Sequence, residues 1–275
     1  MGIKITCLVD NRVAEGLLSV HGFSLWIETG KEKILFDTGM GDALFHNADR
    51  LGIDLGLTDI LILSHGHYDH TSGIDQVLKN SQNTVVYCHP GVMRPRYLVR
   101  DGSARPIQMP QKSMAAIDGL PSHNIHWVSK SGMINERIGI ACPIKRETSY
   151  EDTGGPFYLD PQGLREDAID DDLALFIKTE KGIVVFVGCC HAGLINTLNQ
   201  ISLLYPESKI LSVMGGFHLL NAGKQRLDMT ISALQSFLPI LLFPCHCTGK
   251  NATQVLKEAF GDQIIPGYAG ARYEF

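Results

Sequence analysis

Two kinds of apolar pattern alternate along the chain. Short runs rich in Val, Ile, Leu and Phe are typical of β-strands, and the longer stretches between them have the helical spacing of apolar residues. The first strand is predicted in "MGIKITCLVDNR". "FSLWIETG" and "KEKILFDTG" then predict neighbouring strands joined by a tight turn around Gly30-Lys31. "TDILILSH" (58–65) is continuously apolar up to Ser64, which indicates a strand buried on both faces. "GIDQVLKNS" predicts a helix, and "NTVVYCHP" predicts the next strand.

The second half of the chain repeats one unit three times, and each unit is a strand, a sharp turn and a helix. The strands are predicted in "GIVVFVGCCHAG", "KILSVMGGFH" and "ILLFPCHCTG", and each leads into an apolar-periodic stretch. Because functional sites of layered α/β proteins are built where strands end, the turn residues are the candidates for chemistry. A histidine stands at each of these turns and at the earlier buried strand: His65, His191, His218 and His246.

Residues 91–172 interrupt this regular order. The segment begins with the basic, proline-interrupted "RPRYLVRDGSARPIQMPQKS" and ends with the acidic "REDAIDDD". Long irregular segments of compact proteins are usually functional or disordered. We therefore predict one domain over residues 1–275, with 91–172 as an insertion or lid over the strand ends.

The overall composition narrows the class of protein. With 44% hydrophobic and 19% charged residues, the 275-residue chain has an ordinary globular composition. The net charge of −5 makes nucleic acid an unlikely partner, and no apolar run is long enough for a membrane span. Seven cysteines at irregular spacings and no signal-peptide pattern lead us to expect a cytoplasmic protein. The sequence leaves a homodimer open.

The residues "HGHYDH" that follow the buried strand are typical metal ligands. His65 and His67 are two apart, so on an extended segment both imidazoles face the same side and can bind one ion. Asp69 and His70 follow as the chain turns, and can face a second ion. The alternative is a group of solvated or hydrogen-bonded histidines at a helix start, but four such residues in six positions favour metal. Two neighbouring ions can share a hydroxide and make it reactive, with Asp69 holding metal and orienting or deprotonating the water.

The motif "HGHYDH" resembles the HxHxDH signature of the metallo-β-lactamase superfamily, and "LFDTG" resembles that family's upstream aspartate motif. The resemblance covers essentially the whole chain. It implies an αββα sandwich, two sheets face to face with helices outside and two metal ions at one edge. It also implies that Asp37 orders the site, that His191 joins His65 and His67, and that His246 joins Asp69 and His70. The bridging aspartate of typical members is missing, because "VGCCHAG" stands where a "GD" turn is expected.

Three further residues are candidates for contact with a small anionic substrate. His218 follows two glycines at a strand end, where it could contact substrate or simply pack. Arg94 and Arg96 could clamp an anionic group such as phosphate, although a run of charges is more often a solvated surface. Cys245 and Cys247 flank His246, and we expect them to pack rather than to ligate metal.

The function we expect is a metal-dependent hydrolase in which a hydroxide held by two Zn²⁺ ions attacks a small anionic, phosphorylated substrate; manganese or iron could replace zinc. "GCCHAGLINT", "MGGFHL" and "PCHCTG" also resemble the dihydropterin–ribofuranosylaminobenzene 5'-phosphate synthase-like subgroup, which implies a condensing enzyme as the alternative. Two other classes stay open. One is a di-metal redox protein, although di-iron relatives have HxExDH with glutamate at the position of His67, and the other is a ligand sensor without turnover.

Overall fold

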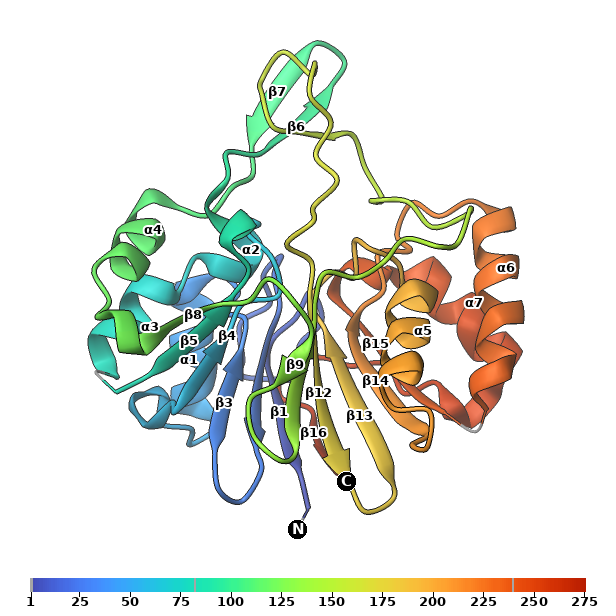
Figure 1. The fold of residues 1–275 in the computed structure, drawn as a ribbon, viewed down its shortest axis with the longest axis horizontal. Helices are drawn as coiled ribbons and strands as arrows, with labels where there is room; N and C mark the ends of the chain where they lie inside the picture. The colour runs from blue at the N-terminus through green and yellow to red at the C-terminus, as the bar shows by residue number, and fades with distance from the viewer. Residues whose placement is uncertain (1, 82, 239) are drawn as a thin grey trace.

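Two β-sheets face each other in the computed structural model, which describes residues 2–81, 83–238 and 240–275 (Figure 1). The first sheet has the strand order β16-β1-β2-β3-β4-β5-β8. Its strands are β1 (Lys4–Val9), β2 (Ser24–Glu28), β3 (Lys33–Phe36), β4 (Ile60–Ile62), β5 (Val85–Cys88), β8 (Ile125–Trp127) and β16 (Arg272–Glu274). The second sheet has the order β15-β14-β13-β12-β10-β9. Its strands are β9 (Gly132–Met133), β10 (Ile138–Ala141), β12 (Ala174–Thr179), β13 (Gly182–Val187), β14 (Ile210–Gly216) and β15 (Leu241–Cys245).

Helices cover the outer faces of both sheets (Figure 1). The first sheet carries α1 (Gly41–Arg50), α3 (Ile74–Asn80) and α4 (Gln111–Asp118), and α2 (Tyr68–Thr71) lies at its upper edge; the second carries α5 (Leu194–Leu204), α6 (Lys224–Leu234) and α7 (Lys250–Phe260). Short 3₁₀ turns complete the order: η1 (Leu55–Leu57), η2 (Pro90–Met93), η3 (Ser122–Asn124), η4 (Gln235–Phe237), η5 (His246–Thr248) and η6 (Gly261–Gln263). None of the helices in the described ranges is long and apolar enough to cross a bilayer.

The two-residue period of the strands explains why the sheets can be covered on both faces. In β12, Leu175 and Ile177 enter the core between the sheets, whereas Ala174 and Phe176 enter the core under the helices of the second sheet. The first sheet divides its side chains in the same way between the central core and a third core under its own helices. Three apolar layers between four layers of secondary structure confirm the predicted αββα sandwich.

The strand–turn–helix units of the second half are also confirmed. The unit β13–α5 is followed by β14–α6 and β15–α7, and the three strands run parallel. Parallel strands end at the same edge of a sheet, so the turns after β13, β14 and β15 lie next to each other. In the first sheet β3 and β4 are parallel too, which brings the turn after β3 beside the turn after β4.

The prediction of a single insertion over residues 91–172 is wrong for its middle part, residues 111–141. Strand β8 completes the edge of the first sheet, β9 and β10 complete the edge of the second, and α4 packs on α3. These elements are short, and proline, glycine and serine surround them, which explains why the pattern looked irregular. Their positions are determined by packing and pairing with the two core sheets, not by a local periodic pattern.

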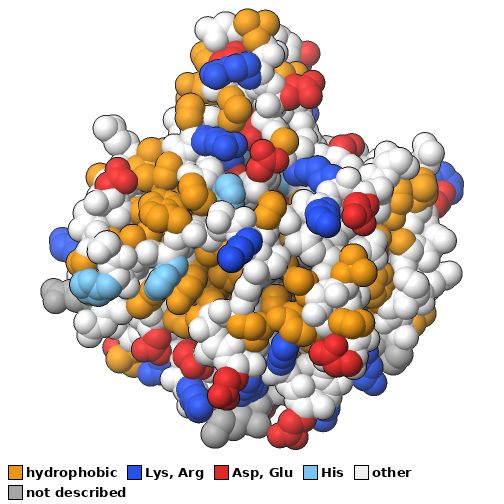
Figure 2. All heavy atoms as spheres, viewed as in Figure 1, with side chains coloured by type: hydrophobic (Ala, Val, Ile, Leu, Met, Phe, Trp, Pro, Cys, Tyr) orange, Lys and Arg blue, Asp and Glu red, His pale blue; other side chains and the backbone are white. Residues whose placement is uncertain are grey.

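A small third sheet stands apart from the sandwich and rises above the strand ends. It has the order β11-β6-β7, with β6 (Tyr97–Arg100), β7 (Ser103–Pro106) and β11 (Phe157–Tyr158). Figure 2 shows it as a projection above the body, with acidic and basic side chains mixed on the visible face. This minisheet is the part of the segment that fits the predicted lid.

A buried ion-pair network fastens the base of the minisheet to the sandwich. Arg96 has no exposed surface, and its guanidinium lies between the carboxylates of Asp167 (Nε to Oδ2, 2.9 Å) and Asp171 (Nη1 to Oδ2, 2.9 Å). Asp171 also accepts a hydrogen bond from the backbone N–H of Gly66, between the two first histidines of "HGHYDH" (2.8 Å). Arg96 is therefore a structural residue, and its predicted role as a substrate clamp is wrong because its guanidinium is already paired.

We predict that Arg96→Met lowers the free energy of unfolding by about 3–5 kcal/mol, since it leaves two buried carboxylates without their cation. Urea unfolding followed by circular dichroism measures this. The matched control is Arg94→Met: the Arg94 side chain is 47% exposed and its Nη1 lies 3.9 Å from Asp170 Oδ2, so the cost should stay below about 1 kcal/mol. Equal effects of the two substitutions would contradict the role given to Arg96.

Candidate metal centre

The histidines predicted to hold the first ion converge at the edge where the strands end. His65 and His67 follow β4, whereas His191 follows β13 in the other sheet. The ring centroids of His65 and His67 are 4.5 Å apart, and those of His191 lie 4.8 Å from His65 and 4.9 Å from His67. All three side chains are buried. The structure thus brings together the three residues assigned to the first ion.

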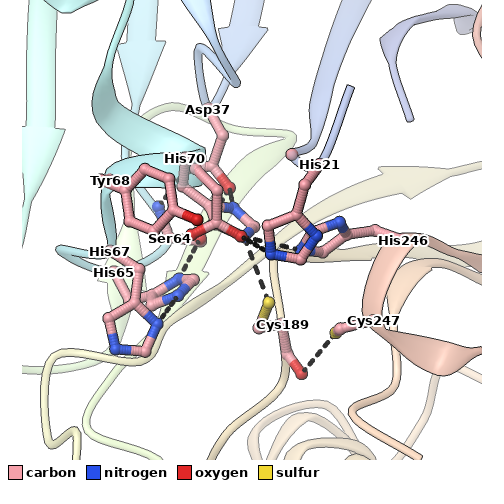
Figure 3. Close-up of polar contacts among 12 residues, drawn as sticks. His21, Asp37, Ser64, His65, His67, Tyr68, His70, Cys189, His246 and Cys247 are labelled. Carbon is pink, nitrogen blue, oxygen red and sulfur yellow. Dashed lines mark hydrogen bonds and ion pairs between the residues drawn. The ribbon is translucent and has the colours of Figure 1, made fainter. Parts of the chain in front are cut away.

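The second predicted set lies directly beside the first. Asp69 Oδ2 is 3.2 Å from His246 Nε2 and 3.8 Å from His70 Nε2, and the rings of His70 and His246 are 5.1 Å apart. His65 and His70 have ring centroids 4.3 Å apart, so the two sets are in contact. In Figure 3, His65 and His67 of the first set lie on one side of His70, and His246 lies on the other.

Hydrogen bonds on the outer nitrogens fix the tautomers of two of these histidines. His191 Nδ1 lies 2.8 Å from the carbonyl oxygen of Thr153, which can only accept, so this nitrogen carries the proton. His246 Nδ1 donates in the same way to the amide oxygen of Asn11 (2.8 Å). In each ring the proton sits on the outer nitrogen, and Nε2 presents its lone pair to the centre.

Asp37 fixes one histidine of each set. Its Oδ2 accepts from His70 Nδ1 (2.7 Å) and from the hydroxyl of Ser64 (2.6 Å). Because the Ser64 hydroxyl donates to Asp37, its oxygen can accept from His65 Nδ1 (2.9 Å). The carboxylate is fully buried and faces away from the centre toward these donors. This is the ordering role that the resemblance implied for Asp37.

Two of the inner nitrogens are left without a partner. His67 Nε2 and His191 Nε2 are buried and unpartnered, and His246 Nε2 has only the carboxylate of Asp69, at 3.2 Å. A buried polar atom without a partner costs about 1–3 kcal/mol, so two of them in neighbouring side chains require an explanation. A divalent cation satisfies such lone pairs, and imidazole with carboxylate is a donor set that zinc accepts. The residues present therefore fit a metal centre.

Cys189 lies between the two sets. Its Sγ is 3.1 Å from His70 Nε2, and it belongs both to a potential ligand group with His65 and His191 and to one with His70 and His246. It stands in "VGCCHAG", where the superfamily's bridging carboxylate was expected. The sulfur of Cys247 is close as well, in a further group with Cys189 and His218. Cys247 is buried, and the expectation that it packs rather than ligates metal stays a prediction.

Sharp turns place four residues around the centre. Asp37, Cys190, His218 and His246 all have positive φ angles, between 44° and 57°, and each comes within three residues of a strand end. For residues other than glycine this backbone conformation costs about 1–3 kcal/mol and is concentrated at functional sites. The strain is consistent with a site that the surrounding sandwich holds in place.

A cavity of about 210 Å³ opens on the centre. The metal-site residues at its floor are His67, Asp69, Cys189, His191 and His246. The minisheet and the chain next to it supply apolar walls, Leu98, Ile107 and Phe157, so this segment does cover the strand ends as a lid would. His218 also lines the cavity, with its ring 4.2 Å from that of His191.

Sequence reasoning missed several residues of this cavity, and two of them bear on its chemistry. Arg105 is its only lining Arg or Lys among the described residues, and its Nη2 donates to the hydroxyl of Tyr68 (2.8 Å); Arg94, proposed for that role, does not line the cavity. His21, for which no role was predicted, lies with its Nε2 3.0 Å from Asp69 Oδ2. Arg105 could have been found in the basic stretch already noted, but its strand assignment was not evident.

Burial and neighbouring charges shift the pKa values of the histidines in opposite directions in the two sets. Burial holds the pKa values of His65 and His191 well below the ordinary value and lowers the pKa of His67 to about 3, so the first set is neutral and ready to bind. In the second set burial opposes the charged imidazole, yet the carboxylates of Asp37 and Asp69 raise the pKa of His70 to about 9. Burial would raise the pKa of Asp69, but His70, with His21 and His246, holds it well below the usual range.

A family model for the metallo-β-lactamase superfamily matches residues 19–178. The chain belongs to this superfamily. The resemblance seen in the sequence is thereby confirmed.

Three similar proteins extend this result. One is the 7,8-dihydropterin-6-methyl-4-(β-D-ribofuranosyl)-aminobenzene-5'-phosphate synthase of Methanocaldococcus jannaschii, 28% identical over 94% of this chain and 90% of the relative. An uncharacterized protein of the same organism is 30% identical over 97% of this chain and 98% of its own length. The crystal structure of Tm1679, a metal-dependent hydrolase of the β-lactamase superfamily, matches with a TM-score of 0.85 and 28% identity, over 99% of both chains.

We predict that the two ions bind with different pH dependence. A ligand must lose its proton to bind metal, so the proton on His70 competes with the second ion until the pH approaches 9. The affinity for the second Zn²⁺ should rise by up to about tenfold per pH unit between pH 6.5 and 9, while His65, His67 and His191, which are already neutral, give the first ion a much flatter profile. Calorimetric zinc titrations at several pH values measure both.

Asp37→Asn tests whether the raised pKa of His70 causes this difference between the two ions. Removing the carboxylate that raises the pKa of His70 should shift the rise in second-ion affinity to lower pH. Asp42→Asn, an exposed acid on α1, should leave both profiles unchanged. Two ions with the same steep profile in the unmodified protein would contradict the asymmetry.

Proposed function

We propose that the protein is a metal-dependent enzyme that joins two small aromatic molecules by transfer of a group, with a phosphate on at least one of them. The Methanocaldococcus relative is named as the synthase of such a phosphorylated product. The observation that carries the metal-dependent part is the convergence of buried, unpartnered imidazole nitrogens with Asp69 at the floor of a cavity. The support for transfer is the synthase relative, which aligns over 94% of this chain.

The walls of the cavity suit an aromatic ligand with an anionic end. Phe157 is half-buried and approaches His67 (ring centroids 5.3 Å) and His191 (5.4 Å), so a flat ring could pack beside it. Arg105 is exposed at the mouth, where its planar guanidinium could bind a phosphate with two hydrogen bonds. The mixed lining would hold both ends of one small molecule.

The residues of the cavity would then have three separate roles in the reaction. Two cations held by His65, His67 and His191 and by Asp69, His70 and His246 would supply Lewis-acid stabilisation of a leaving oxygen. Asp69, which is kept ionised, would orient the attacking amine or water and accept its proton. Leu98, Ile107 and Phe157 would limit the access of water, which matters if an amine is to be the acceptor.

Hydrolysis is the second candidate. The fold match to Tm1679, a metal-dependent hydrolase, favours it. The two reactions differ only in the acceptor: an aromatic amine displaces the leaving group in transfer, and water displaces it in hydrolysis.

The experiment supplies a 7,8-dihydropterin with a phosphoester leaving group on its 6-methylene, with and without 4-(β-D-ribofuranosyl)aminobenzene 5'-phosphate. The protein is loaded with Zn²⁺ or Mn²⁺, and products are identified by mass spectrometry. A coupled product supports transfer, whereas 6-hydroxymethyl-dihydropterin alone supports hydrolysis. Chelation should abolish either reaction and added metal should restore it; activity that survives complete removal of metal would contradict the proposal.

We predict that His67→Ala or Asp69→Ala abolishes turnover while the circular dichroism spectrum stays unchanged. Each substitution removes a metal ligand at the floor of the cavity but no core contact between the sheets. Steady-state kinetics on the metal-loaded variants measure the effect. Full activity in either variant would rule out the proposed centre.

We predict that Arg105→Ala raises the KM for a phosphorylated substrate by about tenfold or more, because a charge-assisted hydrogen bond contributes about 1.5–3 kcal/mol. The KM for the unphosphorylated analogue should change little. The matched control is Arg100→Ala, an exposed arginine on the adjacent strand β6 that does not line the cavity. Equal losses for both substrates would show that Arg105 does not bind the phosphate.

A further inference from the structure

His21 lies at the edge of the candidate metal centre, although it is distant in sequence from all the motifs that contain the predicted ligands. It lies in the loop between β1 and β2, and its side chain is 57% exposed. Its Nε2 is 3.0 Å from Asp69 Oδ2, and its ring centroid lies 4.8 Å from that of His246. Figure 3 shows His21 and His246 side by side, on the flank of the centre away from His65 and His67.

The backbone after His21 is held against Asp69 by close contacts. A Cβ added at Gly22 would lie 2.7 Å from the carbonyl oxygen of Asp69, so only glycine permits this approach. The next residue, Phe23, donates its backbone N–H to the same oxygen (3.3 Å). The position of His21 is therefore built into the fold, although its ring reaches solvent.

Asn11 connects the His21 loop with the ligand His246. Its amide oxygen accepts from the backbone N–H of Gly22 (3.4 Å) and from His246 Nδ1 (2.8 Å). Since His246 carries its proton on Nδ1, its Nε2 has a lone pair, and this nitrogen lies 3.2 Å from the ionised Asp69 Oδ2. A proton on Nε2 makes this contact an ion pair, and a divalent cation can take the place of that proton between the two atoms.

His21 is placed to join the same cation. Donor atoms of His21, Asp69 and His246 all lie within 4.8 Å of one another. Imidazole–carboxylate–imidazole is a typical donor set for zinc and related divalent ions. A group that also contains His246, with His70 and Cys189, lies deeper, and all its members are buried. The exposed His21 lines the cavity, so it lies on the cavity side of the second set.

We propose that His21 is a further metal ligand, which together with Asp69 and His246 holds a divalent transition-metal cation on the cavity side of the second ligand set. The proposal rests on the metal centre proposed above. It adds a donor from the β1–β2 loop that none of the motifs contains.

The experiment uses Co²⁺ as the probe in the full-length protein and follows both equilibrium binding and ligand-field absorption. His21→Ala removes the imidazole, and His21→Gln keeps a hydrogen-bond donor to Asp69 without the imidazole lone pair. The control is His46→Ala, an exposed histidine on α1. We expect both His21 variants to bind the more weakly held ion about tenfold or more weakly, with an altered absorption spectrum, while His46→Ala matches the unmodified protein.

The results separate this proposal from the one on which it rests. Wild-type affinity and spectrum in His21→Gln would overturn it, because His21 would then act only through a hydrogen bond to Asp69. Unchanged binding in His21→Ala would overturn it as well, while the two-ion centre would stand. If the unmodified protein binds no Co²⁺, the metal centre itself is wrong and His21 loses its role with it.

Discussion

The site depends on hydrogen bonds to the outer nitrogens of its histidines. Thr153, Asn11 and Asp37 each hold an Nδ1 of a histidine as a donor, and Ser64 passes the effect of Asp37 to His65. A neutral imidazole whose outer nitrogen donates has an unprotonated inner nitrogen. His65 Nε2 and His67 Nδ1 are themselves in hydrogen-bond contact (3.0 Å), and a bound cation would replace this contact.

The sandwich makes this arrangement possible by bringing distant segments to one edge. His65 and His67 come from the first sheet, and His191 and His246 come from the second. The central core between the sheets fixes their relative position, because residues of both sheets pack in it. Stability of the core and geometry of the site are therefore linked, and the strained turns at Asp37, His218 and His246 are held by the core around them.

The minisheet is coupled to the centre through its base as well as through the cavity wall. The carboxylate of Asp171 forms an ion pair with Arg96 and accepts a hydrogen bond from the backbone N–H of Gly66. One carboxylate therefore contacts both the base of the minisheet and the segment that carries His65 and His67. The next acid, Asp172, accepts from the backbone N–H of Ala192, directly after His191. The acidic run thus supports the backbone of two ligand segments from outside the cavity.

The strand–turn–helix order could be predicted from the sequence because the main strands of both sheets have local apolar signals. The superfamily, and the sandwich that it implies, could be predicted because "HGHYDH" and "LFDTG" are local motifs. From the sequence alone β8, β9 and β10 could not be predicted, because they are short and depend on pairing with distant strands.

Which polar side chains meet depends on the tertiary structure. Arg96 and Arg105 look alike in a basic stretch, yet one is buried between two carboxylates and the other lines the cavity mouth. His21 has no motif, and Cys189 replaces a carboxylate that the family pattern expects. The physical reason is that local periodicity reports which face of an element is buried, whereas a site consists of contacts between side chains that are remote in sequence.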